Sequence, residues 1–319
     1  MRRSKPIKSI LVAYNGFVHK ERLPAQVASL AKEHRALLHI VNVVPDLPKP
    51  PWRSPMISAE ELQKALVKER HRALGKLAER ARAQGIRVKP KIRVGVAHVE
   101  LIREALVTRS DLVVAIDAPL RRDRTRGFGS TTMKLLRNCP CPVWVIRSPT
   151  KRKRRRIMAA VDLGPEGDEA NLPNDRIIEL ATVLARDKGS TVYVFHAWSL
   201  WGEAYLRGRA GVPEREIQKL LVETKQTQVG RMGKLLADHA PDNIDLRIMV
   251  ERGQPRDLIP AAVEKHKIDV LVMGTVSRTG LPGVLVGNTA EKIFKQLSSS
   301  VITVKPEGFV SPVVEEEAE

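Results

Sequence analysis

Aromatic residues and cysteines are scarce in this 319-residue sequence, and each shortage excludes a class of protein. Phe, Trp and Tyr make up only 4% of the chain, whereas proteins that bind single-stranded nucleic acid stack bases on such side chains. The two cysteines, Cys139 and Cys141, are too few for a disulfide framework or a four-cysteine zinc site, and they fit a reducing compartment. We interpret each of them as a packed small hydrophobe.

Long apolar runs and familiar catalytic motifs are also missing. No stretch of 18 apolar residues occurs, and the short run Ile10 to Tyr14 is too brief for a signal peptide, so we expect a cytoplasmic protein without a membrane span. The P-loop and PP-loop patterns are absent, and no Ser-His-Asp or Cys-His arrangement can be assembled. His196 is a lone histidine, and the sequence offers no second metal ligand at a useful spacing from it. We therefore predict no catalytic residue, no metal site and no enzymatic activity, although slow ATP hydrolysis stays open.

Acidic residues are also few relative to basic ones, and this imbalance is uneven along the chain. Lys and Arg number 55 against 36 Asp and Glu, which gives a net charge of +19. Residues 1–150 hold 30 basic and 12 acidic residues, 151–156 are all basic, and 157–319 hold 19 basic and 24 acidic residues. An anionic partner such as a nucleic acid or another polyanion would therefore bind the first half of the chain.

What the sequence does contain is an internal repeat. IRVGVAHVELI around Gly95 returns 158 residues later as MVERGQPRDLI around Gly253. At the same offset DLVVAI matches DVLVMG, Gly129-Ser130-Thr131 matches Gly287-Asn288-Thr289, and VWVIR matches VITVK. Earlier blocks match at shorter offsets, ILVAYNG with IMAAVDL and HIVNVV with YVFHAW. The chain is thus two copies of one unit.

Each copy alternates short apolar strands with helices, which predicts a parallel sheet covered by helices on both faces. Ser58 and Glu61 form a capping box at the start of a long helix that Gly85 ends. The strand that follows alternates apolar residues with Arg87, Lys89, Lys91 and Arg93, so we expect one face in water, and Pro90 places it at a sheet edge. We assign 1–149 to the first domain (copy one), 150–156 to a basic linker, 157–308 to the second domain (copy two) and 309–319 to an acidic tail.

A ligand site is expected beyond the carboxyl ends of the strands in copy two. Asp162 follows the first strand, Gly274 ends the fourth, and Gly287-Asn288-Thr289 opens a helix whose free N–H groups suit a phosphate. An alternative is that Asn288 or Thr289 only caps the helix. Copy one has Asn15 in place of Asp162, and the basic residues of its loop APLRRDRTRGFG either grip a phosphate-rich ligand or are simply solvated.

The unit resembles the universal stress protein (Usp) domain in its strand starts ILVAYNG and IMAAVDL, its DVLVMGT strand and its loop-helix junction. The resemblance implies two tandem Usp domains, each an α/β domain with a five-stranded parallel sheet of order 3-2-1-4-5. It implies that the two domains pair within the chain through their last strands, and a homodimer stays open. It implies a cytoplasmic stress role. Nucleotide-binding members carry an aspartate after strand one and the pattern Gly-x2-Gly-x9-Gly-Ser/Thr.

Copy two follows this pattern in part. Ser277 stands where the second glycine should be, and Asn288 replaces the hydroxyl residue; in copy one the first two glycine positions hold Ile116 and Pro119. The resemblance therefore places a nucleotide, ATP or AMP with Mg²⁺, in copy two alone. The residues assigned to that site are Ala160, Val161, Asp162, Ala197, Met273, Gly274, Ser277, Gly287, Asn288 and Thr289. The degenerate site of copy one comprises Asn15, Gly129, Ser130 and Thr131.

The function we expect is that of a non-enzymatic stress protein that binds a nucleotide or another small ligand. Two alternative functions stay open. One is polyanion or nucleic-acid binding through the basic first half and the linker. The other is a lipid-like ligand in the cleft of copy one, where Ile116 and Pro119 replace glycines.

Overall fold

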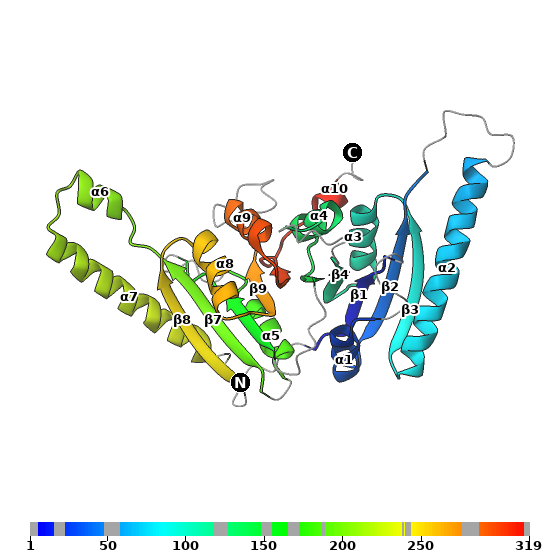
Figure 1. The fold of residues 1–319 in the computed structure, drawn as a ribbon, viewed down its shortest axis with the longest axis horizontal. Helices are drawn as coiled ribbons and strands as arrows, with labels where there is room; N and C mark the ends of the chain where they lie inside the picture. The colour runs from blue at the N-terminus through cyan, green and yellow to red at the C-terminus, as the bar shows by residue number, and fades with distance from the viewer. Residues whose placement is uncertain are drawn as a thin grey trace. The chain divides into compact units, whose positions relative to one another are not determined.

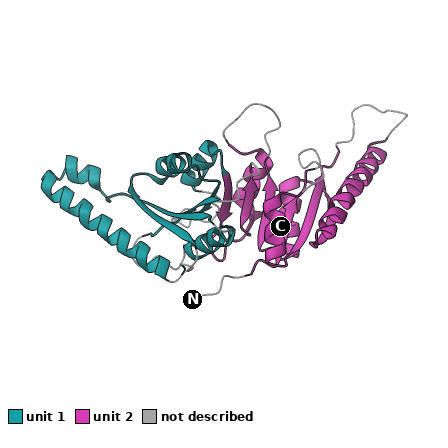
Figure 2. Ribbon diagram, turned by 60° about the horizontal axis from the view of Figure 1, so that its bottom comes forward, with its two compact units in different colours: residues 1–4, 152–299 teal, residues 5–151, 300–319 magenta. Residues whose placement is uncertain are grey.

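The structure is a computed structural model of the chain, and it describes residues 6–15, 23–47, 58–117, 127–147, 155–164, 172–186, 189–237, 239, 244–275 and 287–315. The chain divides into two compact units (Figure 2). Unit 1 is residues 1–4 and 152–299, and unit 2 is residues 5–151 and 300–319. Unit 1 thus holds most of copy two, while unit 2 holds copy one and the last strand of copy two.

Unit 2 is an α/β unit in which parallel strands alternate with helices (Figure 1). Five strands lie in the order β3-β2-β1-β4-β5, all parallel, with β3 at the edge. The elements are β1 (Ser9–Ala13), α1 (Ala25–Glu33), β2 (Leu37–Val44), α2 (Ala59–Ala83), β3 (Arg87–Val94), α3 (Ala97–Val107), β4 (Leu112–Ile116), α4 (Ser130–Asn138) and β5 (Val143–Ile146).

The last strand of copy two also belongs to unit 2. This strand, β10 (Ser300–Val304), pairs antiparallel with β5, with Ile302 opposite Trp144. The finding confirms the expected pairing of the two last strands within the chain. Beyond β10 the chain forms α10 (Pro312–Glu315), and Ser311 and Val313 are buried, so the segment that we expected to be an acidic tail contains packed residues.

Unit 1 repeats the alternation. Its four parallel strands lie in the order β8-β7-β6-β9. The elements are β6 (Arg156–Ala160), α5 (Asn174–Leu184), β7 (Thr191–Trp198), α6 (Glu203–Gly208), α7 (Glu214–Ala237), β8 (Asp245–Arg252), α8 (Pro255–Lys265), β9 (Val270–Gly274) and α9 (Asn288–Gln296). A small apolar cluster around Trp198, Ile217 and Leu221 holds α6 and α7 against β7 and β8.

Local sequence explains where the long helix α2 begins and ends. The Ser58 side chain accepts from the Glu61 N–H while the Glu61 carboxylate accepts from the Ser58 N–H, which confirms the capping box. Gly85 follows with a φ of 78°, a left-handed conformation that glycine adopts without strain. Among the described residues, no helix combines the length and the apolar character that crossing a bilayer requires.

Candidate functional site

The predicted site of copy two lies in unit 1, at the carboxyl ends of three neighbouring strands. Ala160 is the register partner of Met273, so the residues after β6 and β9 leave the sheet side by side. Gly287 N–H donates to the Thr275 carbonyl oxygen at 2.8 Å, which brings the start of α9 to the same edge. Ala197 lies near the end of β7, on the other side of β6. The structure therefore brings together the predicted residues that it describes; Ser277 lies outside the described residues.

The start of α9 is open to solvent at its first two residues. Gly287 is the N-cap residue and is buried, while Asn288 and Thr289 are the first helical residues and are exposed. Capping by Asn288 or Thr289, the alternative kept from the sequence, is therefore wrong, because the N-cap position belongs to a residue without a side chain. A helix start of this kind carries the positive end of the helix dipole.

Thr275 is a site residue that the sequence analysis missed. It is 2% exposed, and its hydroxyl has no hydrogen-bond partner among the described residues. A buried hydroxyl without a partner costs roughly 1–3 kcal/mol, so proteins rarely keep one without a reason. The same residue receives the Gly287 N–H through its carbonyl oxygen, so the hydroxyl lies close to the start of α9.

Asp162 is held in place by a second missed residue, Asn174. The Asn174 amide accepts from the Asp162 N–H at 3.1 Å and donates to the Asp162 carbonyl oxygen at 2.6 Å. One carboxylate oxygen of Asp162 accepts from the Gly164 N–H at 3.0 Å, which is the turn role that the sequence analysis also allowed. Arg231 of α7 donates to the Leu163 and Gly164 carbonyl oxygens and fixes the rest of this turn.

His196 has a structural role that a comparison of the copies explains. Its Nδ1 lies 3.2 Å from the Val161 carbonyl oxygen, and the side chain is buried. In copy one the Asn42 amide donates to the Tyr14 carbonyl oxygen at 2.7 Å. Asn42 and Tyr14 occupy the positions that His196 and Val161 occupy in copy two, so both side chains tie the second strand to the residue after the first.

The corresponding site of copy one, in unit 2, is built differently. Asp117 occupies the position of Thr275, and its carboxylate accepts from the Gly129 N–H at the start of α4 at 3.3 Å. The same carboxylate lies 3.5 Å from the Thr132 hydroxyl and 3.6 Å from Nε of Arg147. The protein thus supplies its own anion at the helix start where copy two leaves a neutral threonine.

The other predicted residues of this degenerate site lie at the ends of the same elements. Asn15 follows β1, and Ser130 and Thr131 open α4; all three are exposed. Pro119 and the arginines between residues 121 and 126 lie outside the described residues, as do residues 151–154 of the basic linker.

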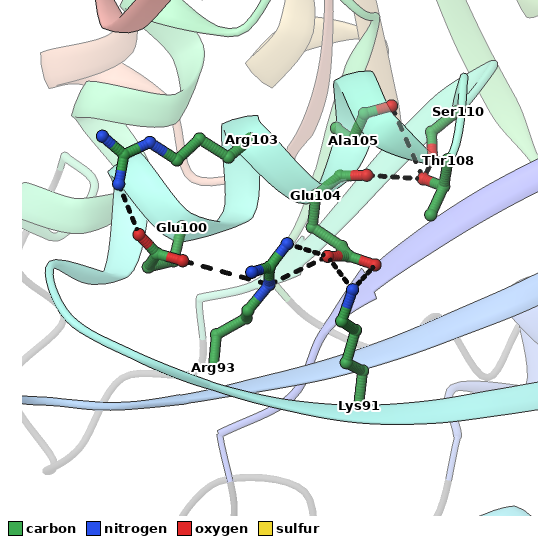
Figure 3. Close-up of polar contacts among 8 residues, drawn as sticks. All are labelled: Lys91, Arg93, Glu100, Arg103, Glu104, Ala105, Thr108 and Ser110. Carbon is green, nitrogen blue, oxygen red and sulfur yellow. Dashed lines mark hydrogen bonds and ion pairs between the residues drawn. The ribbon is translucent and has the colours of Figure 1, made fainter. Parts of the chain in front are cut away.

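The basic face of the edge strand β3 is exposed at Arg87, Lys89 and Lys91, as expected, and its last two cations also form ion pairs. Lys91 and Arg93 point toward α3 and pair with the carboxylate of Glu104, whose side chain is only 3% exposed (Figure 3). Burial alone would raise the pKa of Glu104, but the hydrogen bonds from both cations outweigh it and hold that pKa below its ordinary value. The alternation of the strand indicates which residues share this face, but it does not reveal that Glu104 of α3 lies beside two of them.

Metal binding by side chains alone finds no support in the described part of the chain, which contains no cluster of three or more His, Cys, Asp or Glu residues that could hold an ion.

The parallel strands and the repeated unit define an α/β protein built from two tandem copies of one domain. The model of the universal stress protein family matches residues 6–147 and 153–305, and the chain belongs to this family. Residues 6–147 and 153–305 correspond to the two copies found in the sequence.

Named relatives are similar over much of the chain. Universal stress protein E of Salmonella typhi is 29% identical over 67% of this chain and 66% of its own length, so the alignment spans slightly under two thirds of that relative. A universal stress protein E homolog of Haemophilus influenzae is 25% identical over 94% of this chain and 97% of its own. The crystal structure of a putative universal stress protein from Pseudomonas aeruginosa is similar in fold, with a TM-score of 0.67, 24% identity and 98% coverage of both chains.

Proposed function

We propose that this protein is a non-enzymatic stress-response protein whose copy two holds an adenine nucleotide or another small phosphate-bearing ligand. The observation that carries the proposal is the start of α9. A buried hydroxyl without a partner among the described residues, on Thr275, lies next to a glycine N-cap and two exposed first-turn residues. A phosphate oxygen would accept from the Thr275 hydroxyl and from the first N–H groups of the helix.

The rest of the site suits the nucleoside part of such a ligand. Asp162 stands after β6 with its main chain clamped by Asn174, and its carboxylate can accept from ribose hydroxyls. Mg²⁺ would arrive with the phosphates, because side chains alone offer no cluster for it among the described residues. We infer holding rather than turnover, since one carboxylate oxygen of Asp162 already accepts from the Gly164 N–H.

Isothermal titration of the full chain with ATP and Mg²⁺ tests this function. We expect one binding event in the wild type and none in Gly287→Trp, whose indole would fill the space before α9. Gly129→Trp, the same change at the start of α4, is the matched control and should retain the binding. Absence of heat from the wild type at high protein concentration, or equal heat from Gly287→Trp, would refute the proposal, with circular dichroism confirming that both variants are folded.

Polyanion binding by the basic half is a second proposal, favoured by the charge of residues 1–150. The structure narrows it, because Lys91 and Arg93 are already paired with Glu104. Arg87 and Lys89 remain exposed on the same strand. Helix α2 adds further exposed basic residues between Lys64 and Arg82, interspersed with exposed acidic ones. If RNA and DNA fail to shift the protein at about 50 mM salt, this proposal is wrong.

A lipid-like ligand in copy one has less support. Asp117 and Arg147 place a carboxylate and a guanidinium at the strand ends where an apolar ligand would have to lie, and their side chains are 19% and 12% exposed. Burying an acyl chain against these charges would cost their hydration.

A further inference from the structure

The two cysteines of the chain lie together between α4 and β5, outside the site described above. Cys139 is the C-cap residue of α4, and its N–H donates to the Leu135 carbonyl oxygen at 3.0 Å. Three residues later the Pro142 carbonyl oxygen accepts from the Val113 N–H of β4 at 2.9 Å. The segment Cys139-Pro140-Cys141 is therefore anchored to a helix at one end and to the sheet at the other.

The two thiols differ in exposure and are hydrogen-bonded to each other. Cys139 is fully buried, whereas Cys141 is partly exposed. The hydrogen bond from the Cys139 thiol lowers the pKa of Cys141, against the opposing effects of burial and of Asp111. The same hydrogen bond, together with burial, raises the pKa of Cys139 well above its ordinary value. The outer sulfur thus has the greater thiolate character, and a protonated thiol lies beside it.

We propose that Cys139 and Cys141 form an oxidation site for hydroperoxides, in which Cys141 is the attacking thiol and Cys139 is the resolving thiol. The Cys141 thiolate attacks one peroxide oxygen, the O–O bond breaks, and two electrons pass from sulfur to the peroxide. Hydroxide leaves and becomes water by taking up a proton, and Cys141 becomes a sulfenic acid.

The second step closes the pair. The Cys139 sulfur attacks the sulfenic sulfur, the S–O bond breaks, and the departing hydroxide takes up the proton that Cys139 releases. Two thiols and one hydrogen peroxide thus give one disulfide and two water molecules. A disulfide across a single residue closes a small, strained ring, so we expect a thiol reductant to open it readily.

The absence of any other cysteine makes the test direct. The full chain is treated with hydrogen peroxide, alkylated with N-ethylmaleimide after denaturation, and weighed by intact mass spectrometry. We expect the wild type to lose two hydrogen atoms and both alkylation sites together, and to recover both with dithiothreitol. Peptide mapping should find Cys139 and Cys141 linked within one chain.

The single variants test the order of attack. In Cys139→Ser, and in Cys139→Ala as a second variant, dimedone should trap a sulfenic acid on Cys141. In Cys141→Ser the buried Cys139 should react at least about tenfold more slowly, because it lacks both exposure and thiolate character. Equal rates in the two serine variants would overturn the assigned order.

The wild type alone can overturn the oxidation site, whatever the variants do. After peroxide treatment, two alkylated thiols, independent oxidation of each cysteine to sulfinic acid, or a disulfide between two chains would each show that the pair does not act as proposed. Because the wild type is folded in this measurement, failure of a variant to fold does not affect the result.

Discussion

The Asp117 carboxylate accepts a hydrogen bond from the Gly129 N–H at 3.3 Å, and this contact distinguishes copy one from copy two. In copy two the corresponding Gly287 N–H donates to a main-chain carbonyl oxygen, that of Thr275, and no carboxylate takes part. A helix start attracts an anion in both copies. Copy one satisfies that attraction with the Asp117 side chain, and in copy two we propose that a ligand satisfies it.

Replacing Thr275 by aspartate, the residue at the corresponding position of copy one, should therefore abolish ligand binding by copy two. Thr275→Asp places a carboxylate at the start of α9, where it would repel a phosphate, so titration with ATP and Mg²⁺ should show no binding. Thr275→Asn, neutral and similar in size to aspartate, is the matched control and should retain more affinity than Thr275→Asp. Equal affinities for the aspartate and asparagine variants would show that charge at this position does not decide binding.

Removing only the Thr275 hydroxyl should change stability and affinity in opposite directions. Thr275→Val keeps the shape and removes a buried polar atom that lacks a partner among the described residues, so the ligand-free protein should be equally or more stable in thermal unfolding. Ligand affinity should fall roughly 2- to 10-fold, the value of one hydrogen bond. A valine variant that binds ATP as well as the wild type would exclude the hydroxyl from the phosphate contacts.

Breaking the ion pairs of Glu104 should destabilise unit 2. Glu104→Gln leaves Lys91 and Arg93 without their shared partner, and because these two side chains are 44% and 31% exposed, we expect a loss of about 1–3 kcal/mol in urea unfolding. Glu79→Gln, at an exposed position of α2, should leave the unfolding free energy nearly unchanged.

The pH dependence of this effect has a definite sign. The folded-state pKa of Glu104 is below the ordinary 4.5, so the stabilisation is fully present above about pH 4.5 and is lost as the pH falls through the folded-state pKa. The stability difference between wild type and Glu104→Gln should therefore shrink as the solution is acidified. A difference that stays constant down to pH 2 would contradict the paired carboxylate.

Lys305 should show the opposite pH behaviour. Burial lowers its pKa to about 7, so below pH 7 the folded protein bears the whole cost of a buried ammonium, and that cost disappears as the pH rises toward 10.5. Lys305→Met should be more stable than the wild type near pH 6, by about 2–5 kcal/mol, with a difference that narrows up to pH 10.5. Lys295→Met, at an exposed position of α9, is the control for losing one positive charge. If its stability difference from the wild type depends on pH in the same way as that of Lys305→Met, the buried ammonium is contradicted.

Much of the fold could be predicted because its signals are local or repeated. The capping box of Ser58 and Glu61 acts within four residues, and the repeat fixes the order of elements in both copies. The strand-end placement of Gly287 follows from the alternation of strands and helices, since parallel strands direct their carboxyl ends to one edge.

The partners of buried polar groups could not be predicted, because they join residues that are far apart in the sequence. Lys91 and Arg93 look like solvated charges until α3 is placed over them and Glu104 is found between them. A comparison of the copies carries a signal for this network: Met249 replaces Lys91 in copy two, and Ala262 replaces Glu104. The cation and its carboxylate are therefore lost together.

Thr275 and Asn174 were missed for the same reason. Nothing in the sequence around Thr275 reveals that its hydroxyl is buried, and the clamp of Asn174 on Asp162 spans twelve residues. Asp117 could have been noticed, because an acid in place of Thr275 changes the charge at the start of a helix.

Native mass spectrometry of the purified full chain is the most direct test of the central claim that copy two holds a phosphate-bearing ligand at the start of α9. The wild type, mixed with ATP and Mg²⁺, should carry one nucleotide per chain, and Thr275→Asp should carry none. Retention of the nucleotide by Thr275→Asp, two nucleotides per chain, or a lipid in place of a nucleotide would contradict it.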